Sequence, residues 1–427
     1  MAEAANPEMV SVPLVGWSLA QALRDVADVY LVTQIRNRDA IARAGWVEGR
    51  DFTAIDSERV ARPLWKFANL LGVGGRTGRG WTVAQAISLF SDAYFERLVW
   101  REFGPRILAG EWDLVHRITP LTPAKPSLVG RRCAKAGIPF VLGPLNGGVP
   151  WPRGFERERN REGERFAALR GLIRLIPGRR ATWRAARAIL VGSRRTQQLI
   201  AAPDRSRTVY IPENGITPER FPWAERPPRR AGPLRACFVG RLVPCKGTDM
   251  LLEAAAPLLR EGRLHLDMIG DGPMLPDLRG LAESLRIGDA VTFHGWVRHD
   301  DVPAIMTACD LLAFPSIREF GGGAVLEAMA LGLPPLVVDY AGPGELVEPG
   351  WGFKVPLADR DTVIADLRAV LDRIAADPSV LDGLGAAARQ RVERKFLWSR
   401  KAGQIRAVYD WVLGRRSEKP APFETRT

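Results

Sequence analysis

Residue types that would indicate a disulfide scaffold or a metal site are scarce in this sequence. Only four cysteines and four histidines occur among 427 residues, and no C-x-x-C pair or other metal-ligand spacing is present. We interpret the cysteines as reduced core thiols of a cytoplasmic protein. No apolar run approaches about 18 residues, so no membrane-spanning helix is expected. No lysine or arginine precedes Arg24, which is unlike a secretory signal peptide.

Lysine is also scarce, with eight lysines against 53 arginines. Residues 1–230 contain 37 basic and 22 acidic side chains, a balance of +15, whereas residues 231–427 contain 24 and 26, a balance of −2. A genomic bias toward arginine would raise both halves alike. The asymmetry therefore predicts an anionic or membrane-borne partner for the first half.

The arginine-rich stretch 153–187 allows two interpretations. Its apolar residues are interleaved with arginines, the composition of an interfacial helix on anionic lipid. A buried helix with a solvated arginine face accounts for the same pattern. Nucleic acid is a weaker candidate partner, because few aromatic residues accompany the cations.

Length and composition predict two globular α/β domains. The chain is 46% hydrophobic and 26% charged, and 427 residues exceed one ordinary core. In both halves short apolar runs alternate with helical patterns, as in doubly wound parallel sheets. The strands expected in the first half are 29–33, 113–118, 140–143, 188–192 and 208–212. Those expected in the second half are 235–239, 264–269, 290–294, 311–314 and 335–338.

A glycine-rich turn followed by a short apolar helix is the most informative feature. Three glycines follow Glu319 and Phe320, and the N–H groups of Phe320, Gly321 and Gly322 would favour an anion such as phosphate. Glu327 is the only charged residue of the apolar helix, where a carboxylate needs hydrogen-bond donors. Ribose hydroxyls would supply them, as in dinucleotide sites. The alternative is a turn before a core helix, with Glu327 capped by an arginine.

Two cations flank an earlier strand-to-helix turn. Arg241 and Lys246 follow an expected strand, at the sheet edge where parallel strands present ligands. A planar guanidinium and a compact ammonium together suit a diphosphate. Cations at a helix start oppose the helix dipole, so a surface pair without a ligand is disfavoured.

Four motifs follow one another in the second half. They are Gly-Arg-Leu-x-x-x-Lys-Gly at 240–247, Ile-Gly-Asp-Gly-Pro at 269–273, Thr-Phe-His-Gly at 292–295, and two glutamates separated by seven residues at 319–327. In this order they resemble the C-terminal half of a retaining glycosyltransferase of family 4, among the group 1 glycosyltransferases. The resemblance is close over 234–350 and extends in outline to the rest.

The resemblance implies an α/β architecture of the GT-B type. Two Rossmann-like doubly wound domains would face each other across a cleft, and a C-terminal helix would cross back to the first domain. The expected boundaries are 1–220 for the acceptor-side domain, 221–233 for the linker, 234–396 for the nucleotide-sugar domain, 397–414 for the crossover helix and 415–427 for a disordered tail.

The implied activity is retaining transfer of a sugar from a nucleoside-diphosphate sugar to a glycan, a lipid-linked glycan or another acceptor, in cell-surface polysaccharide or glycolipid synthesis. Arg241 and Lys246 would stabilise the charge of the leaving phosphate. Glu319 would bind the donor sugar and His116 would face it. The complete set of residues assigned to the donor is Gly240, Arg241, Lys246, Gly270, Val297, Glu319, Phe320, Gly321, Gly322 and Glu327. The residues assigned to the acceptor side are Gly16, His116 and Asn146.

No metal or other cofactor is expected, because the cations take the place of a metal. The Asp-x-Asp pair at 359–361 is interpreted as a helix cap, and His265, His294 and His299 as structural. A nucleotide-sugar epimerase of the same fold and a basic nucleic-acid-binding protein are the alternatives. The expected location is cytoplasmic, with peripheral attachment to the inner face of the membrane through 153–187 as a further hypothesis.

Overall fold

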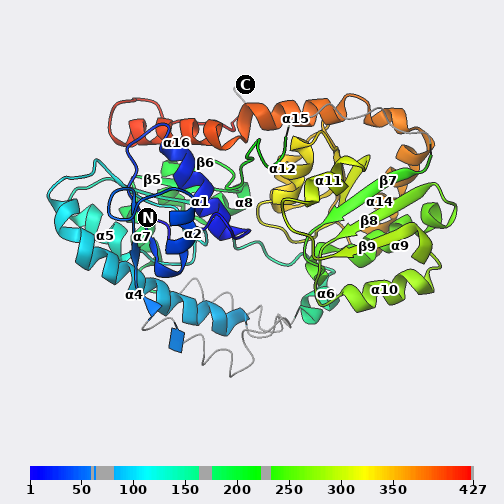
Figure 1. Cartoon of the computed structure of the whole chain (residues 1–427), viewed down its shortest axis with the longest axis horizontal. Coiled ribbons are helices and arrows are strands. Elements are labelled where there is room, and N and C mark those ends of the chain that lie inside the picture. The colour runs from blue at the N-terminus through cyan, green and yellow to red at the C-terminus, as the bar shows by residue number, and fades with distance from the viewer. Residues whose placement is uncertain (59–61, 64–80, 163–175, 223–231, 425–427) are drawn as a thin grey trace. The chain divides into compact units, whose positions relative to one another are not determined.

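The computed structural model describes residues 1–58, 62–63, 81–162, 176–222 and 232–424 (Figure 1). Two compact units are present, and neither is continuous in the chain. The first comprises 1–148, 164–215 and 398–427, and the second comprises 149–163 and 216–397. The first domain is expected to end at residue 220, but the chain passes from the first unit to the second after residue 215. Residues 149–163, which the prediction places in the first domain, belong to the second unit.

The first unit contains parallel strands. Strands β1 (Leu31–Gln34) and β2 (Phe52–Ile55) pair with each other, and a second sheet has the order β3-β4-β5-β6. Its strands are β3 (Val115–Arg117), β4 (Phe140–Leu145), β5 (Ala188–Val191) and β6 (Thr208–Tyr210). Residues 1–4 join the two sheets, because the Ala2 N–H donates to the Val32 carbonyl and the Ile118 N–H donates to the Met1 carbonyl, both at 2.9 Å. The sequence pattern predicted neither this extended segment nor β2.

Helices pack around these strands. They are α1 (Val12–Leu23), α2 (Arg38–Arg43), α4 (Trp81–Leu108), α5 (Leu128–Lys135), α7 (Arg179–Ala185), α8 (Arg194–Leu199) and α16 (Trp398–Val412). Helix α16, the expected crossover helix, lies beside α1 in the first unit (Figure 1). Ala402, Ile405 and Val408 of α16 enter the same core as Leu19.

The expectation of a disordered tail is wrong for residues 415–424. The ring of Phe423 lies 5.7 Å from that of Tyr210, and Glu424 forms an ion pair with Arg194. Aromatic burial of this kind holds a chain end in place.

The second unit is a parallel sheet of the order β12-β11-β10-β7-β8-β9. Its strands are β7 (Leu234–Val239), β8 (Leu264–Ile269), β9 (Val291–Gly295), β10 (Leu311–Phe314), β11 (Pro335–Asp339) and β12 (Phe353–Pro356). The first five confirm the expected strands, and β12 was not predicted. Four buried residues in a row in β10 are typical of a parallel strand covered on both faces.

The helices of the second unit are α6 (Glu156–Arg161), α9 (Thr248–Arg260), α10 (Leu275–Ser284), α11 (Val302–Thr307), α12 (Gly323–Ala330), α13 (Ala341–Leu346), α14 (Arg360–Ala376) and α15 (Leu384–Lys395). Most of them alternate with its strands, except α6, which precedes them all, and α15, which follows α14. The sequence pattern of residues 379–396 predicts a single helix, whereas Gly383, with φ 77°, separates a 3-10 turn from α15.

Helix α6 comes from the first half of the sequence and is anchored by ion pairs. Arg161 bonds to Asp277 of α10 at 2.8 Å, and α6 lies near α10 (Figure 1). Buried Glu158 pairs with Arg360 of α14 at 3.4 Å. These partners, which lie far away in the sequence, explain why the segment belongs to the second unit.

All four cysteines are buried thiols that form no disulfide bond, as expected for core thiols. Among the described helices, none combines the length and the apolar character needed to cross a membrane. Most of the proposed interfacial helix within 153–187 lies outside the described residues.

Candidate functional site

Three loops at the carboxyl ends of β7, β8 and β9 pack tightly together. The Gly270 N–H donates to the Gly295 carbonyl at 2.9 Å, and the Gly240 N–H donates to the Ile269 carbonyl at 3.0 Å. A Cβ atom on Gly270 would lie 1.9 Å from the carbonyl oxygen of Gly240, and Gly270 has φ 143°. Only glycine permits this approach, so Gly240 and Gly270 shape the loops on which charged side chains sit.

Arg241 and Lys246 lie on the first of these loops. Lys246 ends a 3-10 turn, and Gly247, with φ 65°, begins α9. The Lys246 ammonium forms an ion pair with Glu319, and the two side chains are 17% and 18% exposed. Arg241 is exposed to solvent. The structure therefore brings Lys246 and Glu319 together, although 73 positions separate them.

The loop after β10 carries the predicted glycine-rich turn. Glu319 accepts a hydrogen bond from the Phe320 N–H at 3.1 Å, so this N–H is already used. Gly322 has φ 61° and begins α12. A Cβ atom on Gly342 would lie 2.1 Å from the Phe320 carbonyl oxygen, so α13 supports the turn closely.

Glu327 of α12 is paired with a histidine and not with an arginine. The Nε2 atom of His299 is 2.9 Å from Oε1 of Glu327. This hydrogen bond raises the pKa of His299 above its ordinary value. A buried carboxylate on an apolar helix does need a donor, but a protein side chain supplies it here. The ribose role of Glu327 stays a prediction.

Trp296 and Val297 follow β9, where the sequence places the donor base. The Trp296 side chain is 75% exposed, the largest exposure among the bulky hydrophobic residues described. Val297 is half-buried. Their contact with a base stays a prediction. All ten predicted donor residues thus lie in or directly after the loops at the carboxyl edge of β7, β8, β9 and β10.

His116, predicted to be catalytic, is enclosed in the first unit. Its Nε2 atom is 2.6 Å from the Gly143 carbonyl, so Nε2 donates, and Nδ1 accepts from the Tyr409 hydroxyl at 2.6 Å. Burial lowers the pKa of His116 to about 3, so the ring is neutral. With both nitrogens engaged, His116 bonds α16 to the sheet in this structure, and its contact with a sugar stays a prediction.

Asn146 is also satisfied within the protein. Its amide nitrogen donates to Glu213 at 2.6 Å, and its oxygen accepts from Ser193 and Thr196 at 3.2 Å each. Gly16 does not lie in a loop. It is buried within α1, where a Cβ atom would lie 2.1 Å from the Ala4 carbonyl oxygen. The loop between the first extended segment and α1 is instead residues 6–11.

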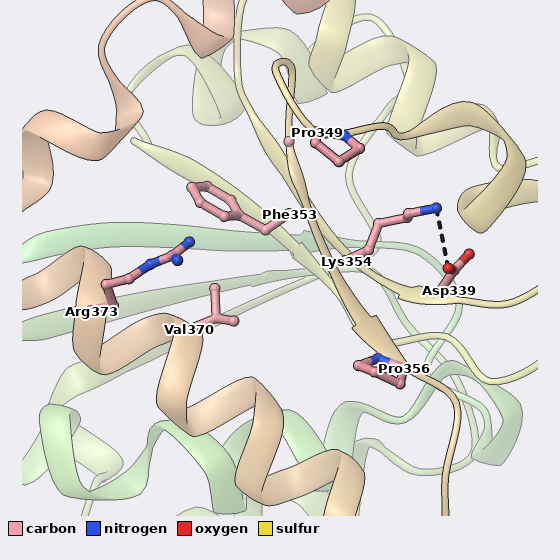
Figure 2. A pocket seen from close by; sticks show the side chains of 8 residues that line it. Asp339, Pro349, Phe353, Lys354, Pro356, Val370 and Arg373 are labelled. Atoms are coloured by element: carbon pink, nitrogen blue, oxygen red, sulfur yellow. Dashed lines mark ion pairs between the residues drawn. The ribbon is translucent and has the colours of Figure 1, made fainter.

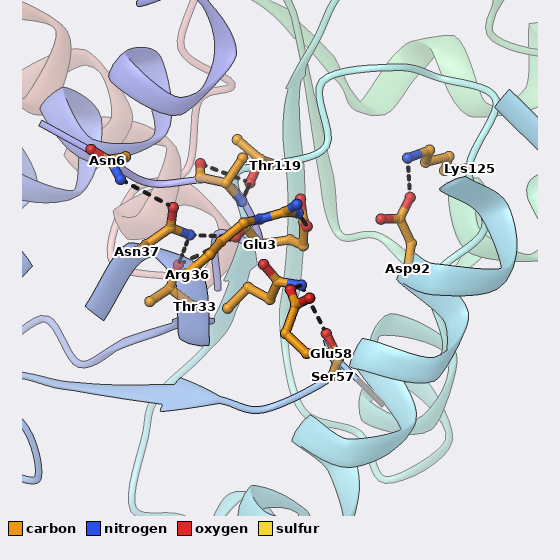
Figure 3. Close-up of polar contacts among 12 residues, drawn as sticks. Glu3, Asn6, Thr33, Arg36, Asn37, Ser57, Glu58, Asp92, Thr119 and Lys125 are labelled. Carbon is orange, nitrogen blue, oxygen red and sulfur yellow. Dashed lines mark hydrogen bonds and ion pairs between the residues drawn. The ribbon is translucent and has the colours of Figure 1, made fainter. Parts of the chain in front are cut away.

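Sequence reasoning missed a cluster of buried polar side chains beside that loop (Figure 3). Gln34 donates to Ser57 at 3.1 Å, and Asn37 donates to Thr33 at 2.9 Å. Asn6 is within 3.5 Å of Asn37. The carboxyl ends of parallel strands are where α/β folds bind ligands, so this is the candidate acceptor side. The sequence signal was the polar run 33–37 after an apolar strand.

A second arrangement in Figure 3 pairs Asp92 of α4 with Lys125. Burial raises the pKa of Asp92 to about 6, against the opposing effect of Lys125. Asp92 and Lys125 are only 13% and 10% exposed, so a nearly enclosed ion pair lies beside the polar cluster.

One surface hollow of the second unit lies away from every predicted donor residue. Phe353 and Lys354 of the edge strand β12 line it with Val370 and Arg373 of α14 (Figure 2). Lys354 is paired with Asp339 at 3.1 Å. The charge of Lys354 is therefore already neutralised, and the hollow offers no convergent set of polar groups for a ligand.

The described residues contain no group of three or more histidine, cysteine or acidic side chains suited to a metal ion. Asp359 caps α14, because its carboxylate accepts from the Thr362 N–H at 3.0 Å. The interpretation of the Asp-x-Asp pair as a helix cap is confirmed.

Comparisons with known proteins agree with this geometry. Residues 220–391 match the family described as Glycosyl transferases group 1. These residues are therefore similar to group 1 glycosyltransferases. The match contains every residue predicted to bind the donor. The chain is also similar to curated proteins over part of their length. A 2-deoxystreptamine glucosyltransferase of Streptomyces kanamyceticus is 32% identical over 189 residues, 44% of this chain and 48% of that protein. A glycogen synthase of Mycobacterium tuberculosis is 33% identical over 219 residues, 50% of this chain and 51% of that protein. The chain spans about half the length of the curated relatives it matches.

Solved structures identify the fold of the whole chain as GT-B. Anabaena HepE, crystallised with UDP, aligns with a TM-score of 0.64 and 17% identity over 96% of this chain and 98% of that one. WaaG, a glycosyltransferase involved in lipopolysaccharide biosynthesis, aligns with a TM-score of 0.54 and 18% identity over 93% and 95%. At such identities the likeness concerns the fold alone.

Proposed function

We propose that this protein is a retaining glycosyltransferase that moves a sugar from a nucleoside-diphosphate sugar to a glycan or lipid-linked acceptor. The observation that carries the proposal is the ion pair of Lys246 with Glu319 at the carboxyl edge of the sheet, with the exposed Arg241 on the same loop as Lys246. The group 1 match over the same residues supports it. HepE, which shares the fold, was crystallised with UDP, so UDP is the first nucleotide to test.

The chemistry follows from where charge develops. When the bond between the anomeric carbon and the phosphate breaks, negative charge grows on the leaving diphosphate. Arg241 and Lys246 would stabilise that charge without a metal ion. Glu319 would separate from Lys246 and accept hydrogen bonds from hydroxyl groups of the sugar. Glu327 would accept hydrogen bonds from the ribose hydroxyls.

Two experiments test the proposal. UDP, GDP, ADP and dTDP are screened by thermal shift, since a ligand that binds only the folded state raises stability. A nucleotide that stabilises the protein is then supplied as its sugar conjugate with candidate acceptors, with and without EDTA. Net transfer that keeps the anomeric configuration and survives EDTA is expected.

Other outcomes would contradict specific parts of the proposal. If no nucleotide raises the stability, the donor assignment is wrong. Inversion of the anomeric centre excludes retention, and loss of activity in EDTA that magnesium restores excludes the metal-free site. Isomerisation of the nucleotide sugar without an acceptor would identify an epimerase instead.

A further inference from the structure

The carboxylate of Glu327 is held by a histidine that the sequence motifs do not assign to the donor site. His299 lies between β9 and α11, and its Nε2 atom is 2.9 Å from Oε1 of Glu327. The two side chains are 23% and 18% exposed. Phe221 lies edge-on to the imidazole, with 5.8 Å between ring centroids. The pair is therefore an enclosed contact and not a solvated surface pair.

The protonation of His299 follows from its contacts. Nε2 carries the proton in the neutral ring, because the Glu327 carboxylate only accepts. Nδ1 is buried and has no hydrogen-bond partner among the described residues. The charged groups facing the ring are Glu327 and Asp300, which favour the cation, and Arg220, which opposes it. The hydrogen bond to Glu327 is the largest effect and raises the pKa of His299 despite burial.

We propose that His299 is a positioning residue of the donor site, which holds Oε1 of Glu327 so that Oε2 receives the ribose hydroxyls of a nucleotide sugar. The inference rests on the proposed function, because it concerns the same site. Neutral His299 already donates a charge-assisted hydrogen bond to the carboxylate, and the cation adds Coulomb attraction, so cationic His299 orients the carboxylate more firmly. It also offsets the negative charge of Glu327 beside an anionic donor.

Donor affinity should therefore depend on pH in one direction. His299 is cationic below its raised pKa and becomes neutral as the pH rises through that value. We expect affinity for UDP-glucose to fall by roughly 5- to 10-fold across this transition, because the Coulomb attraction between the imidazolium and the carboxylate is lost. UDP-glucose is a suitable probe, because its diphosphate is esterified at both ends and does not titrate near neutral pH.

The test is calorimetric titration of the full chain with UDP-glucose between pH 5.5 and 8.5. His299→Gln keeps a neutral donor, so its affinity should be independent of pH and close to that of the unmodified protein at high pH. His299→Ala removes the donor and should bind more weakly than His299→Gln at every pH. His265→Gln is the matched control, because His265 is half-buried and bonds to Thr292 and not to Glu327, and it should keep the original profile.

Histidine NMR provides a readout that does not depend on catalysis. The protein has four histidines, so four imidazole signals are expected, and the one lost in His299→Gln belongs to His299. Its pKa should lie above 6.5 and decrease in Glu327→Gln. Addition of UDP-glucose should shift this signal but not that of His265.

The outcomes separate this inference from the proposed function. If the unmodified protein binds no UDP-glucose and no other nucleotide sugar at any pH, the proposed function fails and the inference fails with it. If it binds UDP-glucose with a profile that His299→Gln shares, or if His299→Ala binds as tightly, only the positioning role is refuted. In that case the pairing with Glu327 serves the fold alone.

Discussion

Replacing Lys246 by alanine should weaken UDP binding more than replacing Arg241, although each change removes one positive charge. Arg241 is exposed, so Arg241→Ala removes one charge-assisted contact, about 1.5–3 kcal/mol, and weakens binding roughly 10- to 100-fold. Lys246 is paired with Glu319 in the ligand-free protein. Lys246→Ala removes a comparable contact and also leaves the Glu319 carboxylate unpaired beside the phosphates.

The repulsion from that carboxylate sets the difference between the two variants. Two like charges about 5 Å apart interact by about 3 kcal/mol at an effective dielectric constant of 20. The pair is 17% and 18% exposed, and discounting for solvent screening leaves about 1–2 kcal/mol. Lys246→Ala should therefore weaken UDP binding by about 2.5–5 kcal/mol in total, and the double change Lys246→Ala with Glu319→Ala should recover about 1–2 kcal/mol of it.

The assay is calorimetry with UDP on all four corners of the mutant cycle. UDP carries no sugar, so any contact of Glu319 with sugar hydroxyls does not enter. Glu319→Ala alone should tighten UDP binding, because it frees Lys246. The reasoning is refuted if the double variant binds UDP no better than Lys246→Ala, or if Lys246→Ala binds as the unmodified protein does.

Three further predictions concern stability and surface binding. Gly270→Ala should lower the free energy of unfolding by about 2–5 kcal/mol, because the new Cβ clashes with the Gly240 carbonyl and φ is unfavourable. In the control Gly280→Ala the new Cβ in α10 meets nothing within 4 Å, and the free energy of unfolding should rise by about 0.5–1 kcal/mol. Equal melting temperatures for the two variants would refute the close-approach argument. Burial lowers the pKa of Lys401 from 10.5 to about 7, so the unfolded chain binds more protons than the folded chain between these pH values, and the free energy of unfolding should rise with pH there. Urea titrations at several pH values measure this slope. It should disappear in Lys401→Met, and an unchanged slope would refute the assignment. The protein should co-sediment with vesicles that contain anionic lipid but not with neutral vesicles, and added salt or replacement of Arg179 and Arg180 should weaken the binding. Recovery of the protein in the supernatant under all these conditions would exclude a membrane-borne acceptor as the reason for the basic first half.

The second unit could be predicted almost element by element. Its strands are continuous apolar runs, and its loops contain glycines and charges in a characteristic order, so local patterns suffice. Strand β12 escaped prediction because Phe-Lys-Val-Pro is only four residues long and ends in proline, which is uncommon within strands. The break at Gly383 escaped because glycine is tolerated within many helices.

The first unit was harder to predict for a physical reason. Residues 1–4 are extended only because backbone groups on both sides bond to them, and Ala2 and Ala4 have little strand propensity of their own. The glycine at position 16 suggested a loop, yet it permits α1 to approach the backbone of residue 4. Such close approaches carry no local signature.

By itself the sequence determined the fold class, the two-unit organisation and the glycine-rich loops of the second unit, because these depend on local composition and on motifs of a few residues. Only the tertiary structure decided which charges and rings meet. It paired Lys246 with Glu319, His299 with Glu327, and His116 with Tyr409, the last across 293 positions. The chain can bring such partners together only after its sheets and helices have packed, so no local pattern records them.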